Sequence, residues 1–438
     1  MSTRPAQPLF NLKAVVRETG VAADTLRAWE RRYGLPEPTR SPSRQRVYSA
    51  RDLDTVRWLS ARQAEGLSIS RAVALWRSLE ADGVDPLLAP GYSLPAVKLA
   101  APSHAEAPTL AALRQEWLTA CAALEEDAAE RTLAQAFAFY PPEQALIEVL
   151  AQGLARVGDL WYRGEFSVQQ EHFATALAMR RLQALLAAAP PPQHARRLLI
   201  ACPPDERHAF APLLVTLLMR RRGWPVVYLG ENLPVLELEG ALQTARPDLV
   251  LMTAQELWTA ARLIPAGRLL AERQVPLAVA GEIFSRRPAL AGAVGGLSVS
   301  ARLEGAAGAL EDLLHRRPPL PGPPGERPPE LRAALERLGQ RRAAMIAALA
   351  DAPGPGAMWP EASERLGQAV EAALVLGDPE ALADELRWIR GLLENRQADG
   401  AVLRGLLGTY RAVAAEMLGP DAAVVLAWLE RAQAGLWT

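Results

Sequence analysis

The segment from residue 197 to residue 314 constrains the fold more than any other part of the chain. Short apolar runs alternate there with longer stretches of helical periodicity. Such alternation is typical of a doubly wound parallel sheet with helices on both faces. The strands that we predict lie at 197–201, 225–229, 248–253, 276–280 and 296–299.

Chemically useful residues follow several of these strands. Because the carboxyl ends of parallel strands meet at one edge of a sheet, and open α/β sheets bind ligands there, we expect these residues to share a site. Glu206 precedes His208 by two residues, so its carboxylate can accept a hydrogen bond from one ring nitrogen and leave the other free to bind a metal. The candidate binding residues at this edge are Glu206, His208, Tyr228, Gly230, Thr253 and Gly281.

Length and two proline-rich segments indicate a multidomain chain. A chain of 438 residues is too long for one ordinary core. The second proline-rich segment, 316–329, has seven prolines among fourteen residues. The predicted parts are a head at 1–80, a linker at 81–108, a four-helix bundle at 109–190, a Rossmann-like (flavodoxin-like) α/β domain at 191–316, a linker at 317–329 and an all-helical C-terminal part at 330–438.

The composition argues against several classes of protein. The two cysteines, Cys121 and Cys202, are too few for a disulfide framework or a cysteine-rich zinc site. The first residues lack the core of a signal peptide, and we see no apolar run as long as a membrane span. We therefore expect a cytoplasmic protein with no membrane partner.

The head has the pattern of a DNA-binding module. Residues 1–80 contain 14 Lys and Arg but 8 Asp and Glu, although the whole chain has a net charge of −1. A basic head favours an anionic partner. A turn at Thr19-Gly20-Val21 separates two predicted helices, the second over 25–33, and an arginine-rich loop flanked by extended pieces follows. The alternative is a solvated arginine face on a small helical domain.

Residues 10–78 resemble the winged helix-turn-helix of MerR-type transcription regulators. The resemblance rests on the segment 25–35, which reads TLRAWERRYGL, and on the wing residues and the segment 48–53 after it. It implies binding to double-stranded operator DNA. By this resemblance the major-groove helix contributes Arg27, Arg31 and Arg32, and the wing contributes Arg44, Arg46 and Tyr48.

A second group of candidate site residues lies in the predicted helical bundle. Trp161 ends one predicted helix, and after nine residues Glu171 and His172 open the next, which begins at Ser167. By itself this pattern fits a core tryptophan beside a solvated Glu-His pair. The spacing nevertheless resembles the tryptophan, nine residues, Glu-His signature of CarH-type photoregulators, which implies that these three residues cap the upper face of adenosylcobalamin.

The α/β domain resembles the cobalamin-binding domains of the same proteins. Residues 206–211 read ERHAFA, similar to the Asp-x-His-x-x-Gly motif in its variant with glutamate, while Thr253-Ala254-Gln255 and Ala280-Gly281 stand where the family has Ser-x-Leu and Gly-Gly. The resemblance implies that His208 is the lower cobalt ligand. Ala211 departs from the motif glycine. Tyr162 also departs, because CarH-type proteins can have there a histidine that captures cobalt after photolysis.

These resemblances imply a regulator and not an enzyme. The predicted protein binds adenosylcobalamin in the dark, assembles as a dimer or tetramer, binds operator DNA and represses, and light releases the DNA. One alternative is a MerR-type regulator whose sensor domain has lost cobalamin or holds another ligand, as Ala211 and Gln255 suggest. Another is a corrinoid-carrier protein that serves a methyltransferase. The C-terminal part resembles no family that we identify, and it fits an oligomerisation, packing or ligand-binding module.

Overall fold

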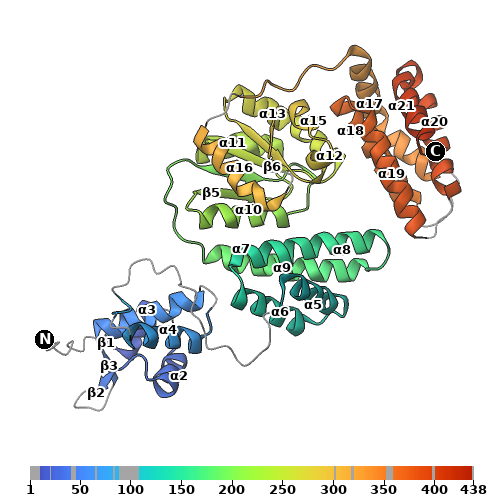
Figure 1. Cartoon of the computed structure of the whole chain (residues 1–438). Helices are drawn as coiled ribbons and strands as arrows, with labels where there is room; N and C mark the ends of the chain where they lie inside the picture. Colours follow the sequence, from blue (N-terminus) through green and yellow to red (C-terminus); the bar gives the residue numbers. More distant parts are fainter. Residues whose placement is uncertain are drawn as a thin grey trace. The chain divides into compact units, whose positions relative to one another are not determined.

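The structure is a computed structural model in which the chain forms two compact units (Figure 1). The first unit contains the head, up to residue 109, together with residues 134–141. The second contains residues 110–133 and everything from 142 onward. The structure describes residues 10–19, 21–40, 46–64, 67–81, 84–87, 108–299, 302–316, 320–351, 359–396 and 400–436.

The head is a helix-turn-helix followed by two more helices. Leu26, Trp29 and Trp76 are buried in its core. Helix α2 ends where Gly34 takes a left-handed conformation, with a φ of 73°, and its N–H donates to the carbonyl of Glu30. The helices are α1 Leu12–Thr19, α2 Ala23–Tyr33, α3 Ala50–Ala64 and α4 Ile69–Ala81. The strands β1 Phe10–Asn11, β2 Thr39–Arg40 and β3 Arg46–Tyr48 form an antiparallel sheet in the order β1-β3-β2.

The helical region before the sheet has its last two long helices joined by a short turn. A capping box opens the last of them at the predicted residue Ser167, because Gln170 N donates to Ser167 Oγ and Ser167 N donates to Gln170 Oε1. The start of the last helix is therefore confirmed. The elements are α5 Leu110–Ala122, α6 Glu126–Phe139, α7 Pro142–Ala145, the π-helix η1 Leu146–Ala151, α8 Gln152–Tyr162 and α9 Val168–Ala187.

The α/β domain contains the five predicted strands, all parallel, in the order β5-β4-β6-β7-β8. Leu199 and Val250 pack on one face against α11, α12 and α13, and the alternate residues Leu198 and Leu251 are buried on the other face. The strands are β4 Leu198–Ala201, β5 Val226–Gly230, β6 Leu249–Thr253, β7 Leu277–Ala280 and β8 Leu297–Ser298. The helices are α10 Phe210–Arg221, α11 Val235–Ala245, α12 Leu257–Ala261, α13 Leu263–Glu272, α14 Glu282–Arg286, α15 Ala289–Ala293 and α16 Leu303–Arg316.

The C-terminal helices pack directly on the α/β domain. One apolar cluster runs from the sheet into these helices, and Arg287 forms ion pairs with Asp378 at 2.7 Å and Asp384 at 2.6 Å. The elements are α17 Pro329–Asp351, α18 Trp359–Leu376, α19 Pro379–Asn395, α20 Gly400–Leu418, η2 Gly419–Asp421 and α21 Ala422–Ala434. The prediction of an all-helical C-terminal part is confirmed for the residues that the structure describes there.

One stretch of these helices corrects an expectation from the sequence. By length and composition alone, Gly400–Ala434 is apolar enough to cross a membrane. The stretch is broken at η2 by Gly419 and Pro420, and Leu406 and Tyr410 are buried against the neighbouring helices. Its apolar residues therefore serve a helical core.

We expect Gly267→Ala to destabilise the α/β domain. A Cβ at Gly267, on α13, would lie 1.9 Å from the carbonyl oxygen of Val294, so backbone must move. Overpacking of this kind costs roughly 1–3 kcal/mol, and the midpoint of thermal unfolding followed by circular dichroism should fall. Gly240→Ala on α11 is the control, because its Cβ would meet no atom within 4 Å. An unchanged midpoint in Gly267→Ala would contradict the packing of α13.

Candidate functional site

A buried carboxylate organises the carboxyl edge of the sheet. Glu206 follows β4 and is only 1% exposed. Its Oε1 accepts hydrogen bonds from the backbone N–H of His208 at 3.0 Å and from His208 Nδ1 at 2.5 Å. Its Oε2 accepts from Gln255 N and from Thr259 Oγ1, both at 2.7 Å. Four donors compensate for the loss of water around the charge, which is why a carboxylate is tolerated here.

The imidazole of His208 is held by one nitrogen and open at the other. The hydrogen bond to Glu206 raises the pKa of His208. Burial would raise the pKa of the Glu206 carboxyl, but the hydrogen-bond donors around it outweigh burial, so that pKa is lowered. The His208 side chain is 61% exposed. When the ring is neutral and donates from Nδ1, Nε2 carries the free lone pair that a metal requires. The predicted pairing of Glu206 with His208 is therefore present in the fold.

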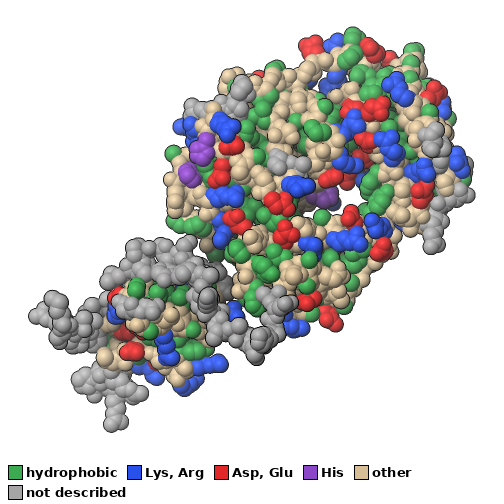
Figure 2. Space-filling view, in the orientation of Figure 1, with side chains coloured by type: hydrophobic (Ala, Val, Ile, Leu, Met, Phe, Trp, Pro, Cys, Tyr) green, Lys and Arg blue, Asp and Glu red, His purple; other side chains and the backbone are tan. Residues whose placement is uncertain are grey.

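Residues of the helical region face this imidazole. The charges of Glu256 and Glu171 both raise the pKa of His208, so α9 brings Glu171 within electrostatic reach of the sheet edge. Glu171 Oε2 lies 2.7 Å from His172 Nδ1, and the ring of His172 is largely exposed. Figure 2 shows the second unit hollowed between the helical region and the sheet domain. The charge of Glu171 on α9 therefore acts on His208 at the sheet edge.

Trp161 lies against the C-terminal helices. The guanidinium of Arg396 sits 5.1 Å from the centre of its ring, beside a cavity of about 400 Å³ that Trp161 helps to line. The next residue, Tyr162, donates from its hydroxyl to the carbonyl of Trp388 at 3.2 Å, and its ring packs on the Trp388 ring. The capping role that we predicted for Trp161 stays a prediction.

The other candidates at the edge have structural partners of their own. Thr253 is buried, and its hydroxyl lies 3.5 Å from Cys202 Sγ. Burial raises the pKa of Tyr228 to about 12, and its hydroxyl donates to the carbonyl of Ala209 at 3.4 Å. Gly281 has a φ of 116°, and a Cβ there would lie 2.0 Å from the carbonyl oxygen of Ala254. Gly230 has a φ of 82° and open space around it.

Two residues that sequence reasoning missed, Thr259 and Asn232, hold the Glu206 loop together with the backbone N–H of Gln255. Gln255 and Thr259 reach it from the loop and helix after β6. Asn232, after β5, accepts from the backbone N–H of Asp205 at 2.9 Å and donates its own N–H to the carbonyl of Glu206 at 3.1 Å. Their position after neighbouring strands was the signal available, but the pattern alone does not say which side chains turn inward.

The head presents arginines on α2. Arg27, Arg31 and Arg32 are exposed, and Arg27 pairs with Asp24 at 3.0 Å. Figure 2 shows Lys and Arg side chains on the surface of this unit. Arg44 lies outside the described residues.

The structure corrects the expectation for Tyr48. This residue is fully buried, and its hydroxyl donates to Glu30 Oε1 at 2.6 Å, while Arg46 Nε donates to Glu30 Oε2 at 2.7 Å. Burial, followed by the Glu30 charge, raises the pKa of Tyr48. Tyr48 therefore fastens β3 to the recognition helix from inside the head and offers no surface to a ligand.

Glu206→Gln should lower the pKa of His208, because the amide keeps the shape of the acceptor but removes its charge. The raised pKa means that the pair is strongest below the ordinary imidazole pKa of about 6.5 and weakens as the pH rises through the folded-state value. NMR titration of the imidazole signals measures the pKa of His208. The variant His208→Gln identifies which signal belongs to this residue among the five histidines. Glu171→Gln, which acts only through space, should lower it less. An equal or higher pKa in Glu206→Gln would contradict the geometry.

Known proteins match both the head and the helical region. Residues 10–79 match the family described as MerR HTH family regulatory protein, and residues 113–186 match the family described as B12 binding domain. Two solved structures are similar: a cobalamin-binding protein from Desulfitobacterium hafniense (16% identity, TM-score 0.28, 45% of this chain and 97% of that one) and the Methanosarcina barkeri monomethylamine corrinoid protein (19% identity, TM-score 0.38, 46% and 96%).

Two curated relatives come from Myxococcus xanthus. The HTH-type transcriptional repressor CarH is 33% identical over 245 residues, which cover 56% of this chain and 78% of CarH. The HTH-type transcriptional repressor CarA is 33% identical over 246 residues, which cover 56% of this chain and 76% of CarA. With a MerR-type helix-turn-helix, a B12-binding domain and this similarity over most of both repressors, the chain belongs to the CarH/CarA family of MerR-type, non-enzymatic transcriptional regulators.

Proposed function

We propose that this regulator senses light through adenosylcobalamin bound between α9 and the carboxyl edge of the sheet. The observation that carries the proposal is the Glu206–His208 pair. A buried, fully bonded carboxylate holds Nδ1 of an imidazole whose ring is 61% exposed. This arrangement orients a histidine toward a metal on its other nitrogen, as carboxylates do behind metal-binding histidines.

The residues present fit a corrinoid. Within the part of the chain that the structure describes, no three His, Cys, Asp or Glu side chains gather in a way that could hold a metal ion. A metal at His208 would therefore take its other ligands from a prosthetic group, as cobalt does in a corrin. The open space at Gly230 suits close approach of such a group. When bound, adenosylcobalamin supplies a cobalt–carbon bond that light breaks.

The roles of the chain's own residues follow from their positions. His208 would hold the lower face of the cobalt, with Glu206 fixing its tautomer. Glu171 and His172, on α9, would cover the upper face, and the reach of the Glu171 charge to His208 supports this role. Tyr162 is bonded to Trp388 and is a poor cobalt ligand, so we do not extend a bis-histidine photoproduct to this protein.

The head converts the state of the sensor into DNA binding. We propose that the cobalamin-bound protein forms a dimer or tetramer in the dark, binds operator DNA in the cytoplasm and represses, and that light loosens the oligomer. Linked heads bind much more tightly than separate heads, because the second contact is intramolecular. Dissociation therefore releases the DNA without any change in the head itself.

Titration of the apoprotein with adenosylcobalamin in the dark should produce the spectral change of a histidine replacing the lower ligand. His208→Ala should abolish this change, and His315→Ala, which removes another exposed histidine of the same unit, should keep it. No lower-ligand change in the parent protein would overturn the cobalamin proposal and leave a regulator with another ligand.

Gel shifts on DNA upstream of the chain's own gene test the proposed light-dependent binding of operator DNA. We expect a shift with adenosylcobalamin in the dark and its loss after illumination. Arg31→Ala/Arg32→Ala should weaken binding at least tenfold and flatten its dependence on salt, because fewer phosphate charges are neutralised. Arg316→Ala removes an exposed arginine from the other unit and should have no effect. A dark complex that survives illumination would refute the light response, and no shift under any condition would favour the corrinoid-carrier alternative.

A further inference from the structure

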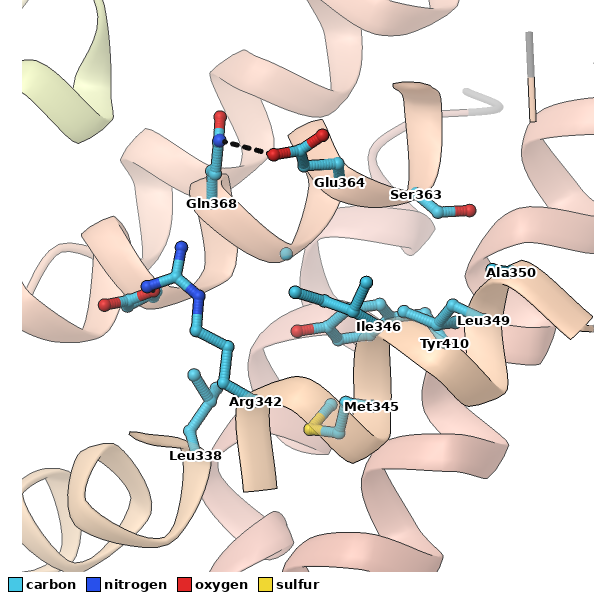
Figure 3. Close-up of a pocket in the computed structure, with 12 residues that line it drawn as sticks. Leu338, Arg342, Met345, Ile346, Leu349, Ala350, Ser363, Glu364, Gln368 and Tyr410 are labelled. Atoms are coloured by element: carbon cyan, nitrogen blue, oxygen red, sulfur yellow. Dashed lines mark hydrogen bonds and ion pairs between the residues drawn. The ribbon is translucent and has the colours of Figure 1, made fainter. Parts of the chain in front are cut away.

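The C-terminal helices form a partly open cavity that belongs to none of the sites above. It has a volume of about 340 Å³ and lies between α17 and α18, with Tyr410 of α20 contributing to its lining (Figure 3). Cavities that hold small molecules begin at about this size. Its position, far along the chain from the cobalamin motifs, makes it a separate candidate.

One wall of the cavity is apolar. Leu338, Met345 and Leu349 of α17 line it, and each is almost fully buried. Ile346, on the same helix, is 50% exposed although it is a large hydrophobic residue. Ile346 and Tyr410 are both labelled among the lining residues in Figure 3. An apolar guest would remove this exposed surface from water, which favours binding.

The opposite wall carries a hydroxyl with nothing to bond. Ser363 of α18 lines the cavity, is 4% exposed, and its Oγ has no hydrogen-bond partner among the described residues. An unsatisfied buried hydroxyl is costly, and rotation of the Ser363 side chain about χ1 would let Oγ bond to a guest and offset that cost. The ring of Tyr410 is also buried here, and burial raises its pKa, so its hydroxyl stays neutral.

The charges at the cavity disfavour an anion. Arg342 pairs with Glu371 at 3.2 Å, which neutralises the guanidinium among the lining residues. Glu364 adds a second carboxylate, which accepts from Gln368 Nε2 at 3.4 Å (Figure 3). An anionic guest would meet two carboxylates and one arginine that is already paired.

We propose that this cavity binds a small, neutral, mostly apolar molecule that carries one hydrogen-bonding group. The apolar wall of α17 supplies the contact area, and Ser363 supplies the specific hydrogen bond. This proposal is independent of cobalamin, because none of its residues belongs to the Glu206–His208 site.

The first test uses p-cresol as the probe, with saturation-transfer NMR and calorimetry on the full chain. Gly367 lines the cavity, and its added Cβ would stand 3.9 Å from Tyr410, an ordinary contact. Gly367→Leu should therefore fold and fill the cavity, and weaken p-cresol binding at least tenfold. Gly339→Leu is the matched control on α17, where a Cβ meets nothing within 4 Å and which lies outside the lining. It should bind p-cresol like the parent.

The second test separates the hydrogen bond from the apolar contact. Ser363→Ala should weaken p-cresol about three- to tenfold, the value of one neutral hydrogen bond, and leave the binding of p-xylene unchanged. The anion p-toluate should bind at least tenfold more weakly than p-cresol to the parent. Equal p-cresol signals in Gly367→Leu and the parent would overturn the proposal. The proposal would also be overturned if Gly367→Leu altered only the oligomeric state, because the cavity would then be a contact surface between copies of the chain.

Discussion

The buried carboxylate of Glu206 is the interaction on which the edge of the sheet depends. Its two oxygens accept hydrogen bonds from the loop after β4 and from the loop and helix after β6, and its backbone carbonyl accepts from Asn232 after β5. Three connections are thus tied to one residue. Removing the carboxylate would leave the backbone N–H of Gln255 without its acceptor, whereas the Thr259 hydroxyl could still donate to the carbonyl of Glu256. The exposed imidazole of His208 rests on this frame, so its orientation is set before any ligand arrives.

The strands of the α/β domain could be predicted because both faces of the sheet are buried, which makes each strand a continuous apolar run. The Glu206–His208 pair could be predicted because both partners lie two residues apart. Contacts between distant segments could not be predicted in this way, because no local pattern relates their residues. Tyr162 and Trp388, for example, are separated by 226 positions. Tyr48 shows a different limit of prediction from sequence. An aromatic residue after an arginine-rich loop is compatible with the surface and with the core, and only the structure shows that its hydroxyl donates to Glu30.

The C-terminal helices contact both parts that surround the candidate site. On the sheet side, Arg365 of α18 pairs with Glu256, whose charge also acts on His208. The same guanidinium lies over the rings of Trp258 and Trp388. Close by, burial and then the charge of Glu256 raise the pKa of Glu385 to about 7. Helix α18 also forms the wall of the apolar cavity, so one rigid element carries both that wall and a contact with the sheet edge.

Tyr162 joins the end of α8 to the C-terminal helices. In this chain the tyrosine ring packs on Trp388, and its hydroxyl reaches α19 at a point where only glycine fits, because a Cβ at Gly391 would lie 2.0 Å from that oxygen. Tyr162 and Gly391 are therefore complementary in shape. Trp161 precedes Tyr162 on the same helix end and lies against Arg396 of the C-terminal part, so a shift of the backbone at this helix end would disturb both contacts.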